Sequence, residues 1–246
     1  SDAANTRIWP QEGKYSLVPG NTYSYTVTKP GYVGQKNNFV ASDSGTITLE
    51  LTQAEKNDSI DKTIYAQWGN FRNGDNHLGI TAASTPYDAQ DAELLWAAKY
   101  GSGWAAAPGS PIIVDGTLVT YIGSKLFKLD LNTGEVLQEG EMVGSSSFSI
   151  VPATYADGMI FVGLAGGKIQ AFNAKTLDSL WVYTDPLGGQ PNCPITYKDG
   201  YIYAGFWNNH TAHANFACIA VADEDLTQTT EEKLASWTYA SAGGFY

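Results

Sequence analysis

The sequence predicts an all-β protein in which a small β-sandwich module precedes an incomplete β-propeller. Two observations carry this prediction: Asp-Gly pairs recur at a fixed spacing among short apolar runs, and this pattern is absent before residue 60. The pairs begin at residues 115, 157 and 199, which are 42 residues apart each time. A fixed period near this length indicates supersecondary units that stack or form a ring.

The stretch 111–137 defines the repeated unit. It reads PIIVDGTLVTYIGSKLFKLDLNTGEVL, in which tight turns separate four apolar runs. Asp-Gly between alternating apolar residues is a strong hairpin signal, because a type I′ turn requires positive φ and Gly adopts it freely. The unit therefore predicts four short antiparallel strands. Such a sheet cannot bury both faces alone, so each unit needs neighbours, as propeller blades have.

From about Trp68 to the end, the repeat resembles the blade of the propeller family related to pyrroloquinoline-quinone (PQQ) enzymes. That family's blades run P-x-V-x-D-G, V-Y-V-G, A-L-D-x-x-T-G and a closing Trp. The chain matches the last two with KLDLNTG at 128–134, AFNAKTL at 171–177 before Trp181, and IAVAD at 219–223 before Trp237. The resemblance implies a quinoprotein-like β-propeller, whose complete ring has about six to eight blades.

Residues 66–246 hold roughly four blades' worth of sequence at this period. They make three nearly full blades and one stray outer strand, predicted at Glu93–Tyr100, ahead of its own blade. The segment QWGNFRNGDNHLGI at 67–80 resembles the start of such propellers. Because so few blades do not close a ring, we expect 66–246 to be a fragment of a larger propeller with two open blade faces. Self-association through these faces is expected, since large apolar patches are rare on soluble monomers.

Residues 1–57 do not share the period and predict a small β-sandwich module. Thr22–Thr28 and Thr46–Leu51 alternate apolar and polar residues, as half-buried antiparallel strands do. With Pro30-Gly31-Tyr32 between them, they are similar to the immunoglobulin-like or carboxypeptidase-regulatory-like sandwiches of bacterial surface proteins. The stretch 53–62 is polar and charged, so we place a linker at 58–65.

Composition restricts the partners. Of 246 residues, 43% are hydrophobic and 16% charged, and the formal net charge is −11. This suits a soluble protein with an ample core, and its acidity argues against nucleic acid as a partner. No apolar run is long enough to insert directly into a membrane, and the first residues lack signal-peptide features, so we expect any export signal or anchor to lie outside the chain.

The two cysteines, Cys193 and Cys218, are predicted to be free and buried. They fall in the first and third strands of one blade, about 9 to 10 Å apart, whereas a disulfide requires Cα atoms within roughly 7 Å. A disulfide, which would imply a different register, is the alternative.

The crossings between blades are the best candidate ligand site. All pass over one end of a propeller, and each combines glycine with an aromatic or amide side chain. They would ring the channel mouth with groups that stack on a sugar or planar ligand, namely Trp104, Phe148, Gln190, Asn192 and Phe245. The alternative is that the aromatic residues wedge between blades as ordinary core.

No metal site and no cofactor are predicted. His210 and His213 share a loop, but zinc requires further ligands and none is adjacent. The oxygen-rich stretches 70–76 and 223–225 lack the order of a calcium-binding loop. Calcium and PQQ remain the alternatives, since the quinone enzymes resembled use both.

No catalytic residue is predicted. The quinone enzymes use adjacent cysteines, a tryptophan floor and a calcium-bound Asp, and this chain has no Cys-Cys pair. It also lacks G-x-S-x-G and a Walker loop. We expect a non-enzymatic binding or scaffolding module of an exported bacterial protein, extracellular or at the cell surface, that recognises a glycan or a protein. The alternatives are a PQQ-dependent or other redox enzyme and a purely structural spacer.

Overall fold

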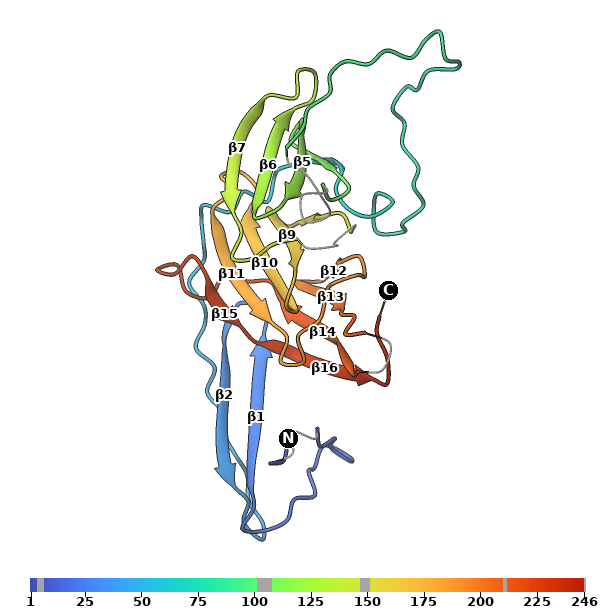
Figure 1. Cartoon of the computed structure of the whole chain (residues 1–246). Helices are drawn as coiled ribbons and strands as arrows, with labels where there is room; N and C mark the ends of the chain where they lie inside the picture. The colour runs from blue at the N-terminus through green and yellow to red at the C-terminus, as the bar shows by residue number, and fades with distance from the viewer. Residues whose placement is uncertain (4–6, 101–107, 147–150, 210–211, 246) are drawn as a thin grey trace.

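A computed structural model describes residues 1–3, 7–100, 108–146, 151–209 and 212–245. This part of the chain contains sixteen strands and no helix, so the predicted all-β class is confirmed. It consequently offers no helix that could cross a membrane. Figure 1 shows the strands gathered in a two-stranded hairpin and three larger sheets.

The first blade comes from the stretch that defines the repeat. Its sheet has the order β3-β4-β5-β6-β7, with all neighbours antiparallel. The strands are β3 (Ala66–Trp68), β4 (Ile112–Val114), β5 (Thr117–Ile122), β6 (Lys125–Asp130) and β7 (Val136–Glu141). The last four are the predicted strands of the unit, and β3 adds a fifth at the edge of β4.

The second blade repeats this arrangement and gains an outer strand from elsewhere. Its own strands are β8 (Thr154–Ala156), β9 (Met159–Leu164), β10 (Lys168–Asn173) and β11 (Ser179–Thr184). The short strand β15 (Glu231–Lys233) pairs in parallel with β11. Because β15 belongs to the insertion between the last two strands of the third blade, the third blade reaches back onto the second.

The third blade has the order β12-β13-β14-β16. These strands are β12 (Thr196–Lys198), β13 (Tyr201–Gly205), β14 (Ala214–Ala220) and β16 (Ala235–Ser241). The three blades follow one another in chain order, and no sheet of the described residues closes into a ring. The prediction of an incomplete propeller is thus confirmed.

The Asp-Gly turns have the backbone that the sequence predicts. In each blade both turn residues have positive φ: 51° and 68° at 115–116, 55° and 82° at 157–158, and 50° and 82° at 199–200. This is the type I′ geometry that joins two twisted antiparallel strands with a two-residue turn. The 42-residue period therefore reports one turn repeated at one place in each blade.

The core lies between the blades. One apolar layer, between the first and second blades, includes Val119, Leu126, Ile160 and Phe172. The other, between the second and third blades, includes Phe161, Ile169, Trp181, Ile202 and Ile219. Each of these two layers takes side chains from two sheets. A smaller buried cluster, which includes Phe127 and Leu129, lies on the other side of the first blade against Trp96 and Tyr100.

The N-terminal region holds one antiparallel hairpin, β1 (Thr22–Lys29) with β2 (Tyr32–Val40). The run Thr46–Leu51, predicted as a strand, lies outside the named strands. The chain beside it follows the edge of β2, where Val33 N donates to Thr52 O at 2.9 Å. One two-stranded sheet is described here, so the likeness to immunoglobulin-like or carboxypeptidase-regulatory-like sandwiches stays a prediction.

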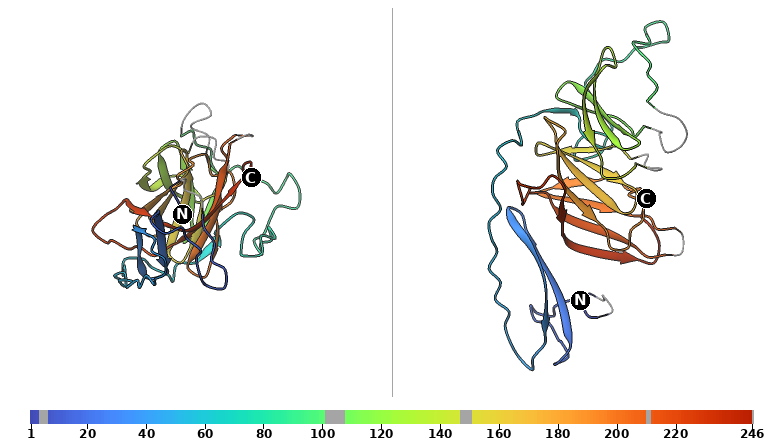
Figure 2. Two further views of the ribbon diagram at one scale, coloured as in Figure 1. Left: turned by 90° about the horizontal axis from the view of Figure 1, so that it is seen from below. Right: turned by 60° about the vertical axis from the view of Figure 1, so that its left-hand side comes forward.

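Residues 57–69, which we call the strap, run across the Asp-Gly end of all three blades. The right-hand view of Figure 2 shows the chain rising from the hairpin to the first blade. Asn57 Nδ2 donates to Asp223 Oδ2 of the third blade at 2.6 Å. Asn173 Nδ2 of the second blade donates to Ser59 O at 3.0 Å. The linker predicted at 58–65 therefore lies against the blades, and its boundaries stay a prediction.

The strap ends on the first blade. Asp115 N donates to Tyr65 O at 2.9 Å, next to the first Asp-Gly turn. Tyr155, in β8, donates twice to the strap: its hydroxyl to Ile64 O and its backbone N–H to Gly69 O, both at 2.7 Å. The strap thus satisfies main-chain groups on both sides of the junction between the first two blades.

The strap packs against the Asp-Gly turn of the second blade but not against that of the third, and this difference can be tested at their glycines. Gly158 and Gly200 both have φ of 82°, but a Cβ on Gly158 would lie 2.7 Å from Ile60 Cγ2 and 2.8 Å from Asp61 O. A Cβ on Gly200 would meet Pro30 at an ordinary 3.5 Å. Alanine at positive φ costs about 1–2 kcal/mol, and the overlap with the strap adds about 1–3 kcal/mol.

We therefore expect Gly158→Ala to lower the free energy of unfolding clearly more than Gly200→Ala. Urea unfolding of the two variants measures the difference. Equal losses would mean that the strap does not press on the second turn.

Candidate functional site

The outward side of the third blade carries an aromatic surface, which we call the third-blade face. Side chains alternate between the two sides of a strand, so aromatic residues at alternate positions gather on one side. The face consists of Tyr203 from β13, Phe216 from β14, Trp237 and Tyr239 from β16, and Phe245, which follows β16.

These rings contact one another. The centre of the Trp237 ring lies 6.2 Å from that of Phe216, with an angle of 25° between the planes, and 6.2 Å from that of Tyr203. Phe245 packs on Phe216 at 5.5 Å. Such offset and tilted arrangements are the favourable ones for aromatic pairs. The face is therefore a continuous aromatic platform.

Strand register shows that Trp237 is the counterpart of Trp181 in the second blade. Trp181 pairs with Ala171 and Trp237 with Cys218, in each case directly before the register shift of the third and fourth strands. Trp181 is fully buried against the third blade and lies 5.8 Å from the ring of Phe161. The third-blade face thus has the composition of a blade interior.

Equivalent side chains differ in solvent exposure between the second and third blades. Tyr183 and Tyr239 each lie two residues after the tryptophan, yet Tyr183 is 3% exposed and Tyr239 61%. Phe216 is partly exposed, whereas its counterpart Ile169 is fully buried. The difference arises because the third blade covers the second and no described blade covers the third.

The junctions also show how such a tryptophan is held. Trp181 Nε1 donates to Val221 O at 3.0 Å, and Trp96 Nε1 donates to Leu131 O at 2.9 Å. Each acceptor directly follows the third strand of the blade on which the tryptophan packs. Trp237 Nε1 makes no such hydrogen bond within the described part of the chain.

Trp96 belongs to the predicted stray strand Glu93–Tyr100. The segment is not a strand in the structure, but Trp96 docks as the outer-strand tryptophan of a preceding blade would. Its ring lies so close to Gly134 that a Cβ there would be 2.5 Å away, and Tyr100 Oη donates to Gly134 O at 2.9 Å. The segment therefore covers the side of the first blade that faces away from the second.

A hollow of about 530 Å³ lies over the third-blade face. Arg7 and Trp9, from the N-terminal segment, also line it. Arg7 Nη1 donates to Thr238 O at 3.1 Å, and its guanidinium carbon lies 4.1 Å from the centre of the Trp9 ring. The lining offers aromatic surface and one cation, which suits an apolar group of a ligand.

The predicted channel-mouth residues are only partly brought together. Trp104 and Phe148 lie outside the described residues. Gln190 exchanges two main-chain hydrogen bonds with Trp207, at 2.8 and 2.7 Å, and is half-buried, as is Asn192. Phe245 lines the hollow, and Gln190 and Asn192 do not. Ligand binding at the channel mouth stays a prediction.

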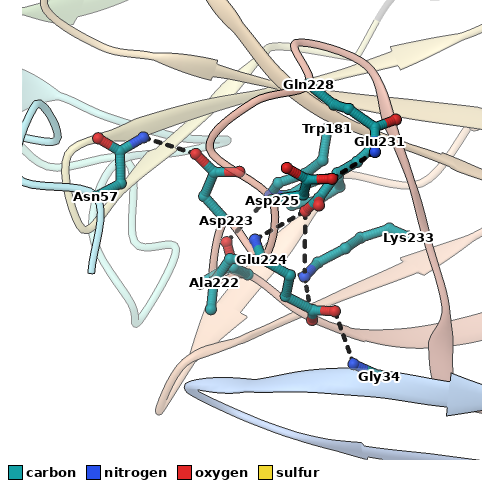
Figure 3. A network of polar contacts seen from close by, with 11 residues as sticks. Gly34, Asn57, Trp181, Ala222, Asp223, Glu224, Asp225, Gln228, Glu231 and Lys233 are labelled. Atoms are coloured by element: carbon teal, nitrogen blue, oxygen red, sulfur yellow. Dashed lines mark hydrogen bonds and ion pairs between the residues drawn. The ribbon is translucent and has the colours of Figure 1, made fainter. Parts of the chain in front are cut away.

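The insertion that provides β15 holds a buried polar network, shown in Figure 3. Lys233, whose side chain is 1% exposed, pairs with Glu224 and lies 3.9 Å from Glu231. Glu224 N donates to Glu231 Oε1 at 2.8 Å. Burial lowers the pKa of Lys233, opposed by Glu224, and raises the pKa of Glu231.

The network joins three parts of the chain. Gly34 N of the hairpin donates to Glu224 Oε2 at 2.8 Å, and Asn57 of the strap donates to Asp223. The other oxygen of Asp223, Oδ1, is buried without a hydrogen-bond partner among the described residues. Burial accordingly raises the pKa of Asp223.

In the described part of the chain, no three His, Cys, Asp or Glu side chains are grouped so that they could hold a metal ion. The acidic residues of the insertion surround an ammonium group instead. His213 Nδ1 lies 2.6 Å from Ser241 O, and His210 lies outside the described residues. Cys193 and Cys218 are free and buried, as predicted.

A family model described as outer membrane protein assembly factor BamB matches residues 85–212, just over half of the chain. The match begins before the Trp96 segment and ends between β13 and β14. No curated protein matches the chain.

Several solved structures resemble part of the chain. A europium-containing methanol dehydrogenase is 15% identical with a TM-score of 0.45, over 57% of this chain and 26% of its own. BamB from Moraxella catarrhalis is 18% identical with a TM-score of 0.37, over 50% and 33%. Quinohemoprotein alcohol dehydrogenase from Comamonas testosteroni is 15% identical with a TM-score of 0.41, over 56% and 23%. The chain spans a third or less of the length of each.

The buried carboxyl of Asp223 leads to a prediction about pH. Because its pKa is raised in the folded chain, its contribution to stability is fully present below the ordinary value of 3.8 and is lost as pH rises through the raised pKa. Asp223→Asn keeps an oxygen for the Asn57 amide and removes the buried charge. We expect it to raise the free energy of unfolding by about 1 kcal/mol at pH 7 and to have little effect near pH 3.

Asp225→Asn is the matched control, because hydrogen bonds from Thr227 lower the pKa of this exposed carboxyl. Its contribution is present at neutral pH and is lost as pH falls, so this variant should be less stable at pH 7. Urea unfolding at both pH values measures the two signs. A loss of stability in Asp223→Asn at pH 7 would show that the charged form is required.

Proposed function

Because the chain belongs to the family of outer membrane protein assembly factor BamB, we propose that it is a non-enzymatic scaffolding module that docks protein through the third-blade face. The observation that carries the proposal is the position of Trp237. It occupies the register that buries Trp181 in the second blade, but its own side of the sheet is partly exposed. An aromatic surface of this kind is typical of the anchor region of a protein interface.

The chemistry of the hollow favours a protein over a glycan. Sugar recognition needs several polar groups around an aromatic platform, because each hydroxyl that loses water must find a new partner. Among the described residues, the third-blade face contributes four aromatic side chains to the lining of the hollow: Phe216, Trp237, Tyr239 and Phe245. Apolar side chains of a protein, by contrast, are the groups that already pack on the equivalent side of the second blade.

PQQ does not fit this hollow. The quinone carries several carboxylates, and their burial requires several cationic or hydrogen-bonding groups. Among the described residues of the lining, Arg7 is the one cation and none is acidic, so none of them would hold the accompanying calcium. No redox step is therefore derived for this site.

The same face supports self-association when no other protein is present. Two aromatic surfaces that meet exclude water from both, and burial of apolar area contributes about 25 cal/mol per Å². We further propose that the module works outside the cytoplasm, in an exported protein, since its family is described by a role in outer membrane protein assembly.

Trp237→Ala tests the docking face. We expect self-association of the chain, followed by sedimentation equilibrium, to weaken by about 30-fold for each Trp237 removed from the contact, because loss of an aromatic anchor typically costs about 2 kcal/mol. Tyr239→Ser, at an exposed position, should weaken it in the same direction without loss of folding. Tyr87→Ala, which removes a fully exposed ring from the long loop before Trp96, is the control. Association that is the same in all three variants would contradict docking through this face.

A further inference from the structure

The third-blade face is not bare in the free chain, because residues 7–9 of the N-terminal segment lie over it. We propose that this segment, which we call the cap, is an intramolecular competitor that must leave the face before a partner docks. The inference rests on the proposed function of the face and adds its regulation.

The cap and a docked partner would need the same space. The open hollow is lined by Arg7 and Trp9 of the cap together with residues of the third-blade face, Trp237 among them. A partner that buried Trp237 as the third blade buries Trp181 would contact the ring across its width. A packed sheet lies about 10 Å from its neighbour, so such a partner would take the positions of Arg7 and Trp9 as well as the hollow, and the two arrangements exclude each other.

The cap also engages the backbone of the face. Arg7 Nη1 donates to Thr238 O, a main-chain acceptor of β16 that lies 231 positions further along the chain. The Arg7 guanidinium lies over the Trp9 ring, where the positive charge is attracted to the face of the aromatic ring. Arg7 and Trp9 thus act as one unit that places an aromatic group over an aromatic platform.

The cap is held more weakly than the blade junctions. Trp9 is 61% exposed, and Arg7 is exposed as well. None of the ion pairs among the described residues includes Arg7. Trp181, in contrast, is fully buried and hydrogen-bonded to the next blade. A contact with so little burial is one that a docking protein displaces.

This competition predicts effects opposite in sign to those of Trp237→Ala. When the binding-competent form is only a fraction of the molecules, the apparent affinity falls by that fraction. In self-association two faces meet, so both copies must be uncapped and the fraction enters twice. With an uncapped fraction of about 0.1 to 0.3, loss of the cap strengthens self-association by about 10-fold to 100-fold. Arg7→Ala and Trp9→Ala should both have this effect.

Tyr15→Ala is the matched control. Tyr15 lies in the same N-terminal region and is 59% exposed, close to the value for Trp9, but it does not line the hollow. Its removal subtracts an exposed ring of similar size without opening the face. The double variant Trp9→Ala/Trp237→Ala should lose the gain of Trp9→Ala, because the cap acts through the face.

Two measurements on the full chain decide the proposal. Nile red, a neutral dye that fluoresces on apolar surface, reports an open face without any partner, and its fluorescence should rise in Arg7→Ala and Trp9→Ala but not in Tyr15→Ala. Sedimentation equilibrium of the same variants reports docking. If both readouts match those of Tyr15→Ala, there is no cap. If association weakens in Arg7→Ala and Trp9→Ala, the segment belongs to the docking surface, which also overturns the proposal.

The failure of the cap can be told from the failure of the docking function. A rise in Nile red fluorescence with no association in any variant would keep the cap and remove the docking role. Association that depends on Trp237 but not on Arg7 or Trp9 would keep the docking role and remove the cap.

Discussion

The structure depends on one constraint: a four-stranded blade can bury a face only where another part of the chain packs on it. Most of the fully buried residues lie between sheets, and each described junction is closed by a side-chain N–H that donates to a main-chain carbonyl of the blade on which it packs. Trp96 and Trp181 make this bond at the first and third blades, and Gln138 makes it to Thr176 O of the second. The bond fixes the register of one blade on another, while the apolar layers supply most of the free energy.

The parts of the chain outside the repeat reinforce these same junctions. The strap crosses all three blades at their Asp-Gly end, where turns would otherwise expose main-chain groups. The insertion of the third blade adds β15 to the edge of the second and buries Lys233 among carboxylates. Since removing one partner of such a buried pair is strongly destabilising, the network favours one relative placement of hairpin, strap and blades.

Sequence periodicity predicted the features that depend on neighbouring residues and missed the contacts between residues far apart in the sequence. The Asp-Gly turns, the four strands of each blade and the free cysteines depend on turn chemistry and strand spacing, so they could be read from residues near one another. The path of 58–65 could not, because its hydrogen bonds go to side chains such as Asn173, far away in sequence. β15 gave no strand signal either, since Glu231–Lys233 is charged and becomes buried only through the pairing of Lys233 with Glu224. Tyr203 could have been found by aligning the repeats, because it lies 42 residues after Phe161. Phe216 could not, because it lies 47 residues after its counterpart Ile169, out of the 42-residue period.

The candidate site follows from the same constraint. In the second blade, an aromatic pair and an indole N–H are structural, because the third blade covers them. In the third blade the equivalent groups, Tyr203 and Trp237, keep their ring contact at 6.2 Å but are partly exposed. A surface already shaped to receive a sheet binds with little reorganisation, and preorganisation of this kind reduces the entropic cost of association. Blade packing and the proposed protein docking therefore rest on one interaction, because the third-blade face has the chemistry of a blade interior.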